Sequence, residues 1–331
     1  MSSVCPYCEQ PVGARSLDHV FPDFLGGRRK IVACAKCNNT FGHTFEAAAA
    51  ADTLHPLHVS IASWGLPLRK RERAWRRAFE YRGMQLDVSV TDEGVKLRLS
   101  GPVPQAGADG KPASVLYADR RDAEKAARQV EKKKGGRVSV EKVLVEITPF
   151  HMPFNFLVDS NLGRTALKMC AALSTFLLGF SLSEITEARP VLRGERPWEE
   201  CVTIAFKSYD SLEALRPPLS HVIYVERHQG RLHGVIQFFG VIQLYCHLGA
   251  SAGSAPEAGM LGTLDPITGA EEILPVTPLG LSPPPDPYKL PELFSRGSGV
   301  WLMKFEESAR ERGASETVNL TGAAHVGGLT G

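Results

Sequence analysis

Four cysteines near the N-terminus form the pattern with the most definite chemistry. They occur as two C-x-x-C pairs, Cys5–Cys8 and Cys34–Cys37, with 25 residues between the pairs. Two close pairs of thiolates can converge on one tetrahedral ion, at Zn–S distances of about 2.3 Å. Because four thiolates leave no open position for chemistry, the pattern predicts a structural zinc ion bound by Cys5, Cys8, Cys34 and Cys37.

Polar residues of a second kind lie between and directly after the two pairs. Asp18 and His19 lie in the intervening segment, and Asn38 follows the last cysteine. The order C-x-x-C, D-H-x-x-P, G-G and C-x-x-C-N-N-x-F-G resembles the HNH endonuclease family with a ββα-metal fold, in its zinc-stapled form. The resemblance covers roughly Cys5 to Glu46.

The resemblance implies a nuclease site in which these residues have distinct roles. Asp18 and Asn38 would hold a divalent cation, Mg²⁺ or Mn²⁺, and His19 would take a proton from the attacking water. Oxygen ligands suit Mg²⁺, and a neutral imidazole with a pKa near ~6.5 suits a general base. Adjacent residues on a strand point to opposite faces. The strand must therefore bend, or the metal must lie to one side, if Asp18 and His19 serve one site.

Some positions around this set depart from the family pattern or have an open role. Many HNH proteins carry an asparagine before the second cysteine pair that orients the catalytic histidine, whereas this chain has Arg28–Ala33 there, without asparagine. His43 lies four residues after Asn39 on the same helical face, where it contacts the cation, the scissile phosphate or only solvent. Glu46 is interpreted as an ordinary helix residue.

Two clusters of basic residues follow the predicted site. Three cations come directly after the Gly26-Gly27 pair, and a second cluster lies near Trp64 and Trp75. A basic stripe with aromatic residues can follow a phosphate backbone and stack on bases, and the alternative is a solvated charged surface. The predicted nucleic-acid contacts are Arg28, Arg29, Lys30, Arg69, Lys70, Arg73, Arg76 and Arg77.

The composition of the whole chain is that of a globular protein. Its 331 residues are 43% hydrophobic and 22% charged, and the net charge is only +2, so any nucleic-acid interface must be a local surface. The sequence contains no run of 18 apolar residues that would predict a membrane span, and no apolar signal-peptide core near Met1. Seven cysteines without an export signal favour reduced thiols and a cytoplasmic protein.

Periodic patterns beyond the cysteine region predict both helices and strands. A helix at 161–180 is apolar on most faces and contains Arg164 and Lys168, so we expect a buried central helix rather than a membrane span. The fold class expected is α+β, with an N-terminal zinc-stapled ββα-metal (HNH) module followed by a larger mixed domain of hairpins and helices. The other predicted elements are a hairpin at 84–100, a helix at 120–134, and strands at 138–148, 202–206, 221–225 and 232–246.

Three consecutive parts are predicted along the chain. Residues 1–55 are the HNH nuclease module, 56–285 are an α+β domain for nucleic-acid binding, sensing or partner docking, and 286–331 are a terminal helix and flexible tail. The predicted function is a metal-dependent endonuclease that hydrolyses DNA phosphodiester bonds, and the resemblance suggests bacterial anti-phage defence.

Three alternatives to this function stay open at the level of the sequence. They are a nuclease effector gated by a partner or small ligand, a nuclease that prefers RNA, and a zinc-dependent nucleic-acid-binding module without catalytic activity. Cutting both strands of DNA needs two sites, so a homodimer is compatible with the sequence, as is a regulatory protein partner. No membrane partner is expected.

Overall fold

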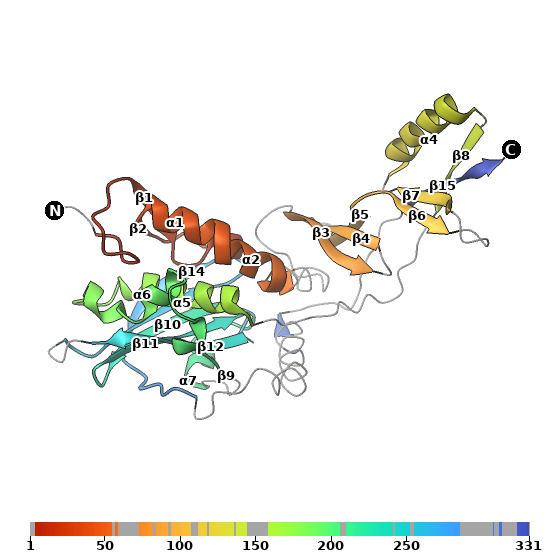
Figure 1. Ribbon diagram of the computed structural model, residues 1–331. Coiled ribbons are helices and arrows are strands. Elements are labelled where there is room, and N and C mark those ends of the chain that lie inside the picture. The colour runs from red at the N-terminus through yellow and green to blue at the C-terminus, as the bar shows by residue number, and fades with distance from the viewer. Residues whose placement is uncertain are drawn as a thin grey trace. The chain divides into compact units, whose positions relative to one another are not determined.

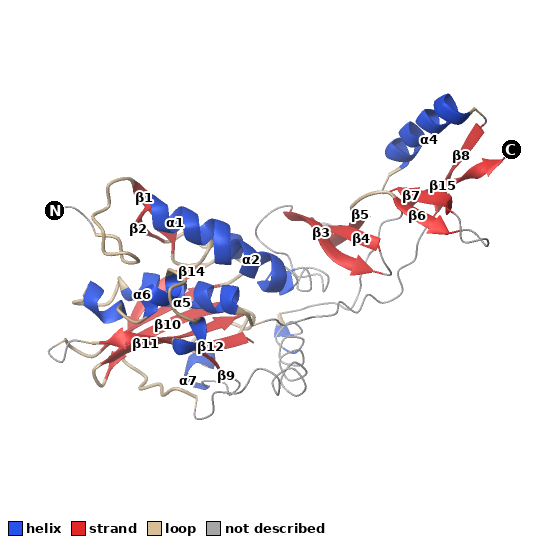
Figure 2. Ribbon diagram, viewed as in Figure 1, coloured by secondary structure: helices blue, strands red, loops and turns tan. Residues whose placement is uncertain are grey.

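The computed structural model is α+β, as predicted, with helices and strands mixed along the chain (Figure 2). The described residues are 4–54, 57–58, 73–81, 84–91, 94–106, 112–117, 119–135, 137–143, 158–205, 210–240, 242–251, 255–284, 307, 311–312 and 323–330. Within these ranges, no helix combines the length and the apolar character needed to cross a membrane.

The contacts between Cα atoms divide the chain into two compact units. Unit 1 combines Met1–Leu57 with Asn155–Ala314, and unit 2 combines His58–Phe154 with Ser315–Gly331. This grouping differs from the three consecutive parts predicted from the sequence, because the N-terminal segment packs on residues that lie beyond position 155. Unit 2 is therefore largely an insertion between the two segments of unit 1.

Unit 1 begins with a hairpin and a helix in the ββα order. Strands β1 (Arg15–His19) and β2 (Lys30–Cys34) pair antiparallel. The helical chain that follows consists of α1 (Ala35–Phe41), η2 (Gly42–Glu46), α2 (Ala47–Ala49) and η3 (Ala50–Leu54). Alanine, the best helix former, continues this helix, while η2 and η3 are π-helical turns, which are frequent at functional sites.

The loop between β1 and β2 depends on its two glycines. After the short helix η1 (Asp23–Leu25), Gly26 has a φ of 99°, which glycine adopts without steric cost. A Cβ atom on Gly27 would lie 1.9 Å from the carbonyl oxygen of Phe21, so a larger residue would require the backbone to shift. The two glycines allow the turn that returns Lys30 to a position opposite His19.

The body of unit 1 is a six-stranded antiparallel sheet in the order β14-β13-β10-β11-β12-β9. Helix α5 (Ser160–Ser174) packs against β10, β11 and β12 and also against η2 of the N-terminal helix, so it lies between the sheet and the ββα segment (Figure 1). This confirms the predicted buried central helix. The strands are β9 (Val202–Ala205), β10 (His221–His228), β11 (Arg231–Phe238), β12 (Ile242–Ala250), β13 (Ala258–Leu264) and β14 (Glu271–Val276).

A buried carboxylate fixes the proline-rich segment that follows β14. Glu226 of β10 is fully buried, accepts a hydrogen bond from Tyr224, and lies 2.8 Å from Nε2 of His233. Its oxygens also accept from the backbone amides of Leu279 (2.7 Å), Gly280 (3.0 Å) and Leu281 (2.7 Å). This segment is therefore held on the sheet. The part of unit 1 that the structure describes also contains the short helices η4 (Leu182–Ile185), α6 (Ala188–Leu192), η5 (Trp198–Glu200) and α7 (Asp210–Glu213).

Among its described residues, unit 2 contains two sheets and one long helix. The three-stranded sheet consists of β3 (Arg73–Tyr81), β4 (Met84–Thr91) and β5 (Gly94–Leu99). The four-stranded sheet consists of β6 (Val103–Ala106), β7 (Pro112–Tyr117), β15 (Ala323–Thr330) and β8 (Arg137–Val143). Helix α4 (Arg120–Lys134) packs on β8 and β15. The predicted hairpin and helix are confirmed here, whereas the segment expected to be a flexible tail contributes β15.

Candidate active site

The four N-terminal cysteines form one cluster. Their sulfur atoms all lie within 4.8 Å of one another, and the sulfurs of Cys8 and Cys34 are 3.7 Å apart. Zn–S bonds of about 2.3 Å in a tetrahedron separate the sulfurs by roughly 3.8 Å. Cys5, Cys8, Cys34 and Cys37 therefore fit the predicted structural zinc ion, and they are the one such group among the described residues.

The first cysteine pair is fixed by contacts with the rest of unit 1. Arg189 of α6, which is buried, donates from Nε to the carbonyl oxygen of Pro6 at 3.2 Å and pairs with Glu9 at 2.5 Å. Tyr7 is fully buried, and its ring packs edge-on against Phe41 of α1 with the centroids 5.2 Å apart. The turn between Cys5 and Cys8 is thus attached both to the helix of the ββα segment and to α6.

The hairpin presents two different faces. Its register pairs His19 with Lys30 and Leu17 with Val32, and residues directly opposite each other in an antiparallel pair share a face. Leu17, Lys30 and Val32 are exposed and His19 is half-buried, so this is the outward face. Asp18 is 2% exposed and lies on the inward face. The regular ladder continues through His19, so adjacent Asp18 and His19 point to opposite faces, as the alternation of strand residues requires.

The environment of His19 favours the neutral imidazole. Burial is the main cause that lowers the pKa of His19, and the cation of Lys30 lowers it further, while Asp23 and Asp18 oppose the shift. A neutral imidazole can accept a proton near neutral pH. His19 therefore has the exposure and the protonation state that a general base needs.

Asp18 belongs to a buried ionic cluster instead. Nζ of Lys168, on α5, lies 2.6 Å from Oδ1 of Asp18 and 2.8 Å from Oε1 of Glu46, and the side chain of Lys168 is 1% exposed. The hydroxyl of Tyr7 donates to Oδ2 of Asp18 at 2.6 Å. Burial by itself would lower the pKa of Lys168, but Glu46 and Asp18 outweigh it and raise this pKa, so the side chain is an ammonium. We name these four residues the Lys168 cluster.

Both oxygens of Asp18 are engaged in contacts inside the protein. Each of its two oxygens already accepts a hydrogen bond, one from an ammonium and one from a hydroxyl, in a position closed to solvent. Asn38 contacts β1 near Asp18. Its Nδ2 donates to Oγ of Ser16 at 2.8 Å and to the carbonyl oxygen of Leu17 at 3.4 Å. Asn38 therefore joins α1 to β1, and the cation-binding roles of Asp18 and Asn38 stay predictions.

The other predicted site residues occupy different surroundings. His43 in η2 is exposed. The backbone amides of Arg28 and Arg29 donate to Oε2 of Glu271 at 2.6 and 3.0 Å. Arg28, Arg29 and Lys30 are exposed, and Lys30 lies opposite His19. Arg69 and Lys70 lie outside the described residues, whereas Arg73, Arg76 and Arg77 belong to β3 of unit 2. Their contacts with nucleic acid stay predictions.

Sequence reasoning missed the members of the Lys168 cluster other than Asp18. Glu46 was interpreted as an ordinary helix residue, but its side chain is 9% exposed and pairs with Lys168. Burial raises the pKa of Glu46, and Lys168 counteracts that effect. The one local signal was a lysine within the apolar helix at 161–180, which does not identify a partner 150 residues away.

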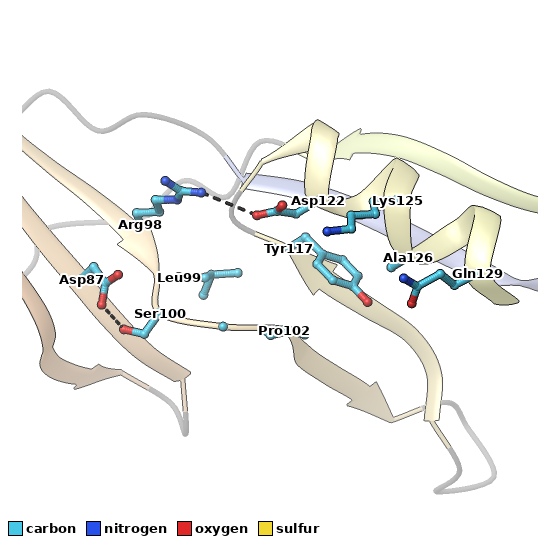
Figure 3. Close-up of a pocket in the computed structure, with 11 residues that line it drawn as sticks. Asp87, Arg98, Leu99, Ser100, Pro102, Tyr117, Asp122, Lys125, Ala126 and Gln129 are labelled. Carbon is cyan, nitrogen blue, oxygen red and sulfur yellow. Dashed lines mark hydrogen bonds and ion pairs between the residues drawn. The ribbon is translucent and has the colours of Figure 1, made fainter.

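Unit 2 carries a cavity of about 740 Å³ between its two sheets and α4 (Figure 3). Tyr117 of β7 and Lys125 and Gln129 of α4 contribute to its lining. Arg98 of β5 also lines it, and its charge is opposed by an ion pair with Asp122 at 3.7 Å. The cavity is polar, and no residue predicted for the nuclease site lines it.

Comparison with known proteins places the N-terminal segment in a family. Residues 5–54 match the sequence profile described as HNH endonuclease. No curated protein and no solved structure matches the chain. The matched residues include the cysteine cluster, the hairpin with His19, and the helix up to Leu54. The N-terminal part of the chain is therefore an HNH domain of the endonuclease family.

Proposed function

We propose that the HNH domain hydrolyses phosphodiester bonds of DNA, with His19 as the general base. The register of the hairpin carries this proposal, because His19 lies directly opposite Lys30 on the outward face. A phosphate bound by Lys30 would lie beside the imidazole. Arg28 and Arg29 extend the positive charge of this surface along the loop, which suits the backbone of a nucleic acid.

The chemistry of the proposal follows from these side chains. A water molecule attacks phosphorus and transfers a proton to the neutral ring nitrogen of His19 as the new P–O bond forms. The bond to the leaving sugar oxygen breaks, and that oxygen is protonated by solvent. Lys30 and the neighbouring arginines stabilise the negative charge on the phosphate oxygens. Zinc bound by the four cysteines would fix the hairpin relative to the helix, without an open position for catalysis.

The cation requirement implied by the family resemblance is part of the proposal to be tested. Mg²⁺ or Mn²⁺ would use ligands other than the buried oxygens of Asp18, because these already accept from Lys168 and Tyr7. Asn38 and the exposed His43 are the remaining predicted ligands. We assign no step of the reaction to a cation at Asp18.

Cleavage of a supercoiled plasmid by the purified chain tests the proposal. Wild-type protein should nick or linearise the plasmid, and His19→Ala should lower the rate by about 10²–10⁴-fold, the usual contribution of a general base, with its zinc content unchanged. Reactions with Mg²⁺, with Mn²⁺ and with EDTA determine the cation requirement. Single-stranded DNA and RNA substrates determine the preferred nucleic acid. A His19→Ala variant as active as the wild type would overturn the role of His19.

A further inference from the structure

Lys168 lies outside the HNH domain, yet it forms two buried ion pairs with residues of that domain. Its ammonium lies between one carboxylate from β1 and one from η2, at 2.6 and 2.8 Å, and it also approaches the carbonyl oxygen of His19 at 3.5 Å. The side chains of Lys168, Asp18 and Glu46 are 1%, 3% and 9% exposed. An ammonium in this position offsets one of the two negative charges of carboxylates that have little access to water.

The cluster joins the first cysteine turn, β1 and η2 of the HNH domain to α5. Tyr7 connects Asp18 to the first cysteine pair, Glu46 belongs to the helix that follows the second pair, and α5 packs against the six-stranded sheet. Separating the partners of a buried ion pair leaves an uncompensated charge in the interior, which is costly. The side chains of the cluster are therefore held in one arrangement. Asp18 and His19 are consecutive in β1. Fixing Asp18 inward therefore fixes His19 outward.

We propose that Lys168 is a positioning residue of the nuclease site, whose ammonium occupies the place of a cation between Asp18 and Glu46 and holds β1 so that His19 faces outward beside Lys30. This inference rests on the proposed function of His19. It makes the HNH domain dependent on a residue supplied from the second segment of unit 1. Lys168 is buried away from the outward face of β1, so it acts through Asp18.

The variant Lys168→Met tests the proposal, with Arg227→Met as a matched control. Arg227 forms an equally buried ion pair with Glu184 in the same unit, at 2.6 Å and with both side chains 1% exposed, but it has no contact with the Lys168 cluster. Lys168→Met loses two buried ion pairs and Arg227→Met loses one. Only Lys168→Met is expected to lower kcat for plasmid cleavage, by about 10- to 100-fold, because a small misplacement of a catalytic group has an effect of this size. KM should stay unchanged, since the basic loop is intact.

A second readout tests the role of Lys168 as the resident cation. Removing the ammonium leaves two adjacent carboxylates, which suit a divalent ion. Mn²⁺ should therefore raise the thermal midpoint of Lys168→Met by more than it raises that of the wild type or of Arg227→Met. If Lys168→Met does not fold, the triple variant Asp18→Asn, Glu46→Gln, Lys168→Met removes all three charges with similar side-chain volumes, and its kcat should fall by the same factor.

The outcomes separate this proposal from the proposed function. Equal kcat values in the wild type and in Lys168→Met or the triple variant would overturn the positioning role while the nuclease function stands. Mn²⁺ stabilisation of all variants alike would overturn the role of Lys168 as resident cation. A wild-type protein that cuts no nucleic acid would overturn the proposed function, and the Mn²⁺ comparison would then still decide whether Lys168 is the cation of the Asp18–Glu46 pair.

Discussion

At the scale of single residues, Asp18 and His19 are consecutive in the sequence, but their side chains lie on opposite faces of β1. Asp18 accepts from Tyr7 and Lys168 in the interior, whereas His19 lies on the outward face opposite Lys30. The sequence motif identifies the candidate residues, but it does not show which face of the strand each side chain occupies. The proposed chemistry therefore depends on the outward residue, and the stability of the domain depends on the inward one.

The pH dependence of cleavage follows from the residues around His19. Burial and the cation of Lys30 lower the pKa of His19, and the base is lost when pH falls through that pKa. The acidic limb of the rate profile should therefore lie below the ordinary histidine value of ~6.5. Lys30→Met removes one lowering cause, so the limb should move to higher pH, as measured by initial rates of plasmid nicking.

Lys36→Met provides the control for that comparison, because Lys36 is an exposed lysine on α1. It should leave the acidic limb in place. A limb that stays at the same pH in Lys30→Met would show that Lys30 does not act on the titrating group.

The hydroxyl of Tyr7 should contribute measurably to stability. Tyr7→Phe leaves Oδ2 of Asp18 without its donor in a position that is 2% exposed. The loss of a partner for a buried polar group costs about 1–3 kcal/mol in the free energy of unfolding. Urea unfolding followed by fluorescence measures this, with Tyr117→Phe in unit 2 as the control. An unchanged free energy for Tyr7→Phe would contradict the buried hydrogen bond.

At the scale of elements, the cysteine cluster joins the start of the chain to the N-terminus of α1. The sulfur atoms of both pairs converge within 4.8 Å, and Cys34 caps α1 by accepting from the amide of Cys37 at 3.4 Å. The hairpin between the pairs is thereby attached at both ends. This arrangement was predictable, because C-x-x-C spacing is local and the chemistry of four thiolates allows few alternatives.

Replacing one cysteine of the cluster should remove the link between the two cysteine pairs of the HNH domain. Cys37→Ser is expected to lose the zinc ion and plasmid cleavage, because zinc binding contributes about 10 kcal/mol or more to the folding of small zinc domains. Elemental analysis of zinc per chain and the thermal midpoint measure this. Cys201→Ser is the matched control, since Cys201 is buried outside the cluster and donates to the carbonyl oxygen of Glu187, as serine also can. A full zinc content in Cys37→Ser would contradict the site.

The contacts of Glu226 with the segment after β14 should make unit 1 less stable at acidic pH. Burial would raise the pKa of Glu226, but hydrogen bonds from His233, Tyr224 and the segment lower it to about 2. The ordinary glutamate value is ~4.3. The carboxylate therefore stabilises the fold fully above that value, and the contribution is lost as pH falls toward 2. Thermal midpoints measured from roughly pH 6 down to roughly pH 2 should fall less steeply in Glu226→Gln than in the wild type. Parallel curves would contradict this role.

At the scale of the whole molecule, unit 1 is assembled from two segments that are distant in the sequence. Local patterns predicted the buried helix at 161–180, the hairpin of β4 and β5, and helix α4, because each has its own periodicity and turn residues. The contact of Lys168 with Asp18 spans 150 residues, and no local pattern encodes it. For the same reason, the association of 1–57 with 155–314 was not predicted.

The HNH segment should therefore not function when it is separated from the rest of unit 1. A fragment of residues 1–57 retains the four cysteines but lacks Lys168 and the surface of α5 on which η2 packs. It should bind zinc, yet its plasmid cleavage should be undetectable and its backbone amide signals poorly dispersed in NMR spectra. A fragment that cleaves at the rate of the full chain would show that the HNH domain is autonomous.

The central claim is that the outward His19 performs the chemistry while the inward Asp18 holds the structure. The most direct test measures the plasmid-cleavage rate and the thermal midpoint of His19→Ala and Asp18→Asn side by side in the full chain. His19→Ala should lose cleavage by about 10²–10⁴-fold and keep the wild-type midpoint. Asp18→Asn should lower the midpoint, because it weakens the pairing of a buried ammonium. Loss of cleavage in Asp18→Asn at an unchanged midpoint, or full cleavage by His19→Ala, would contradict the account.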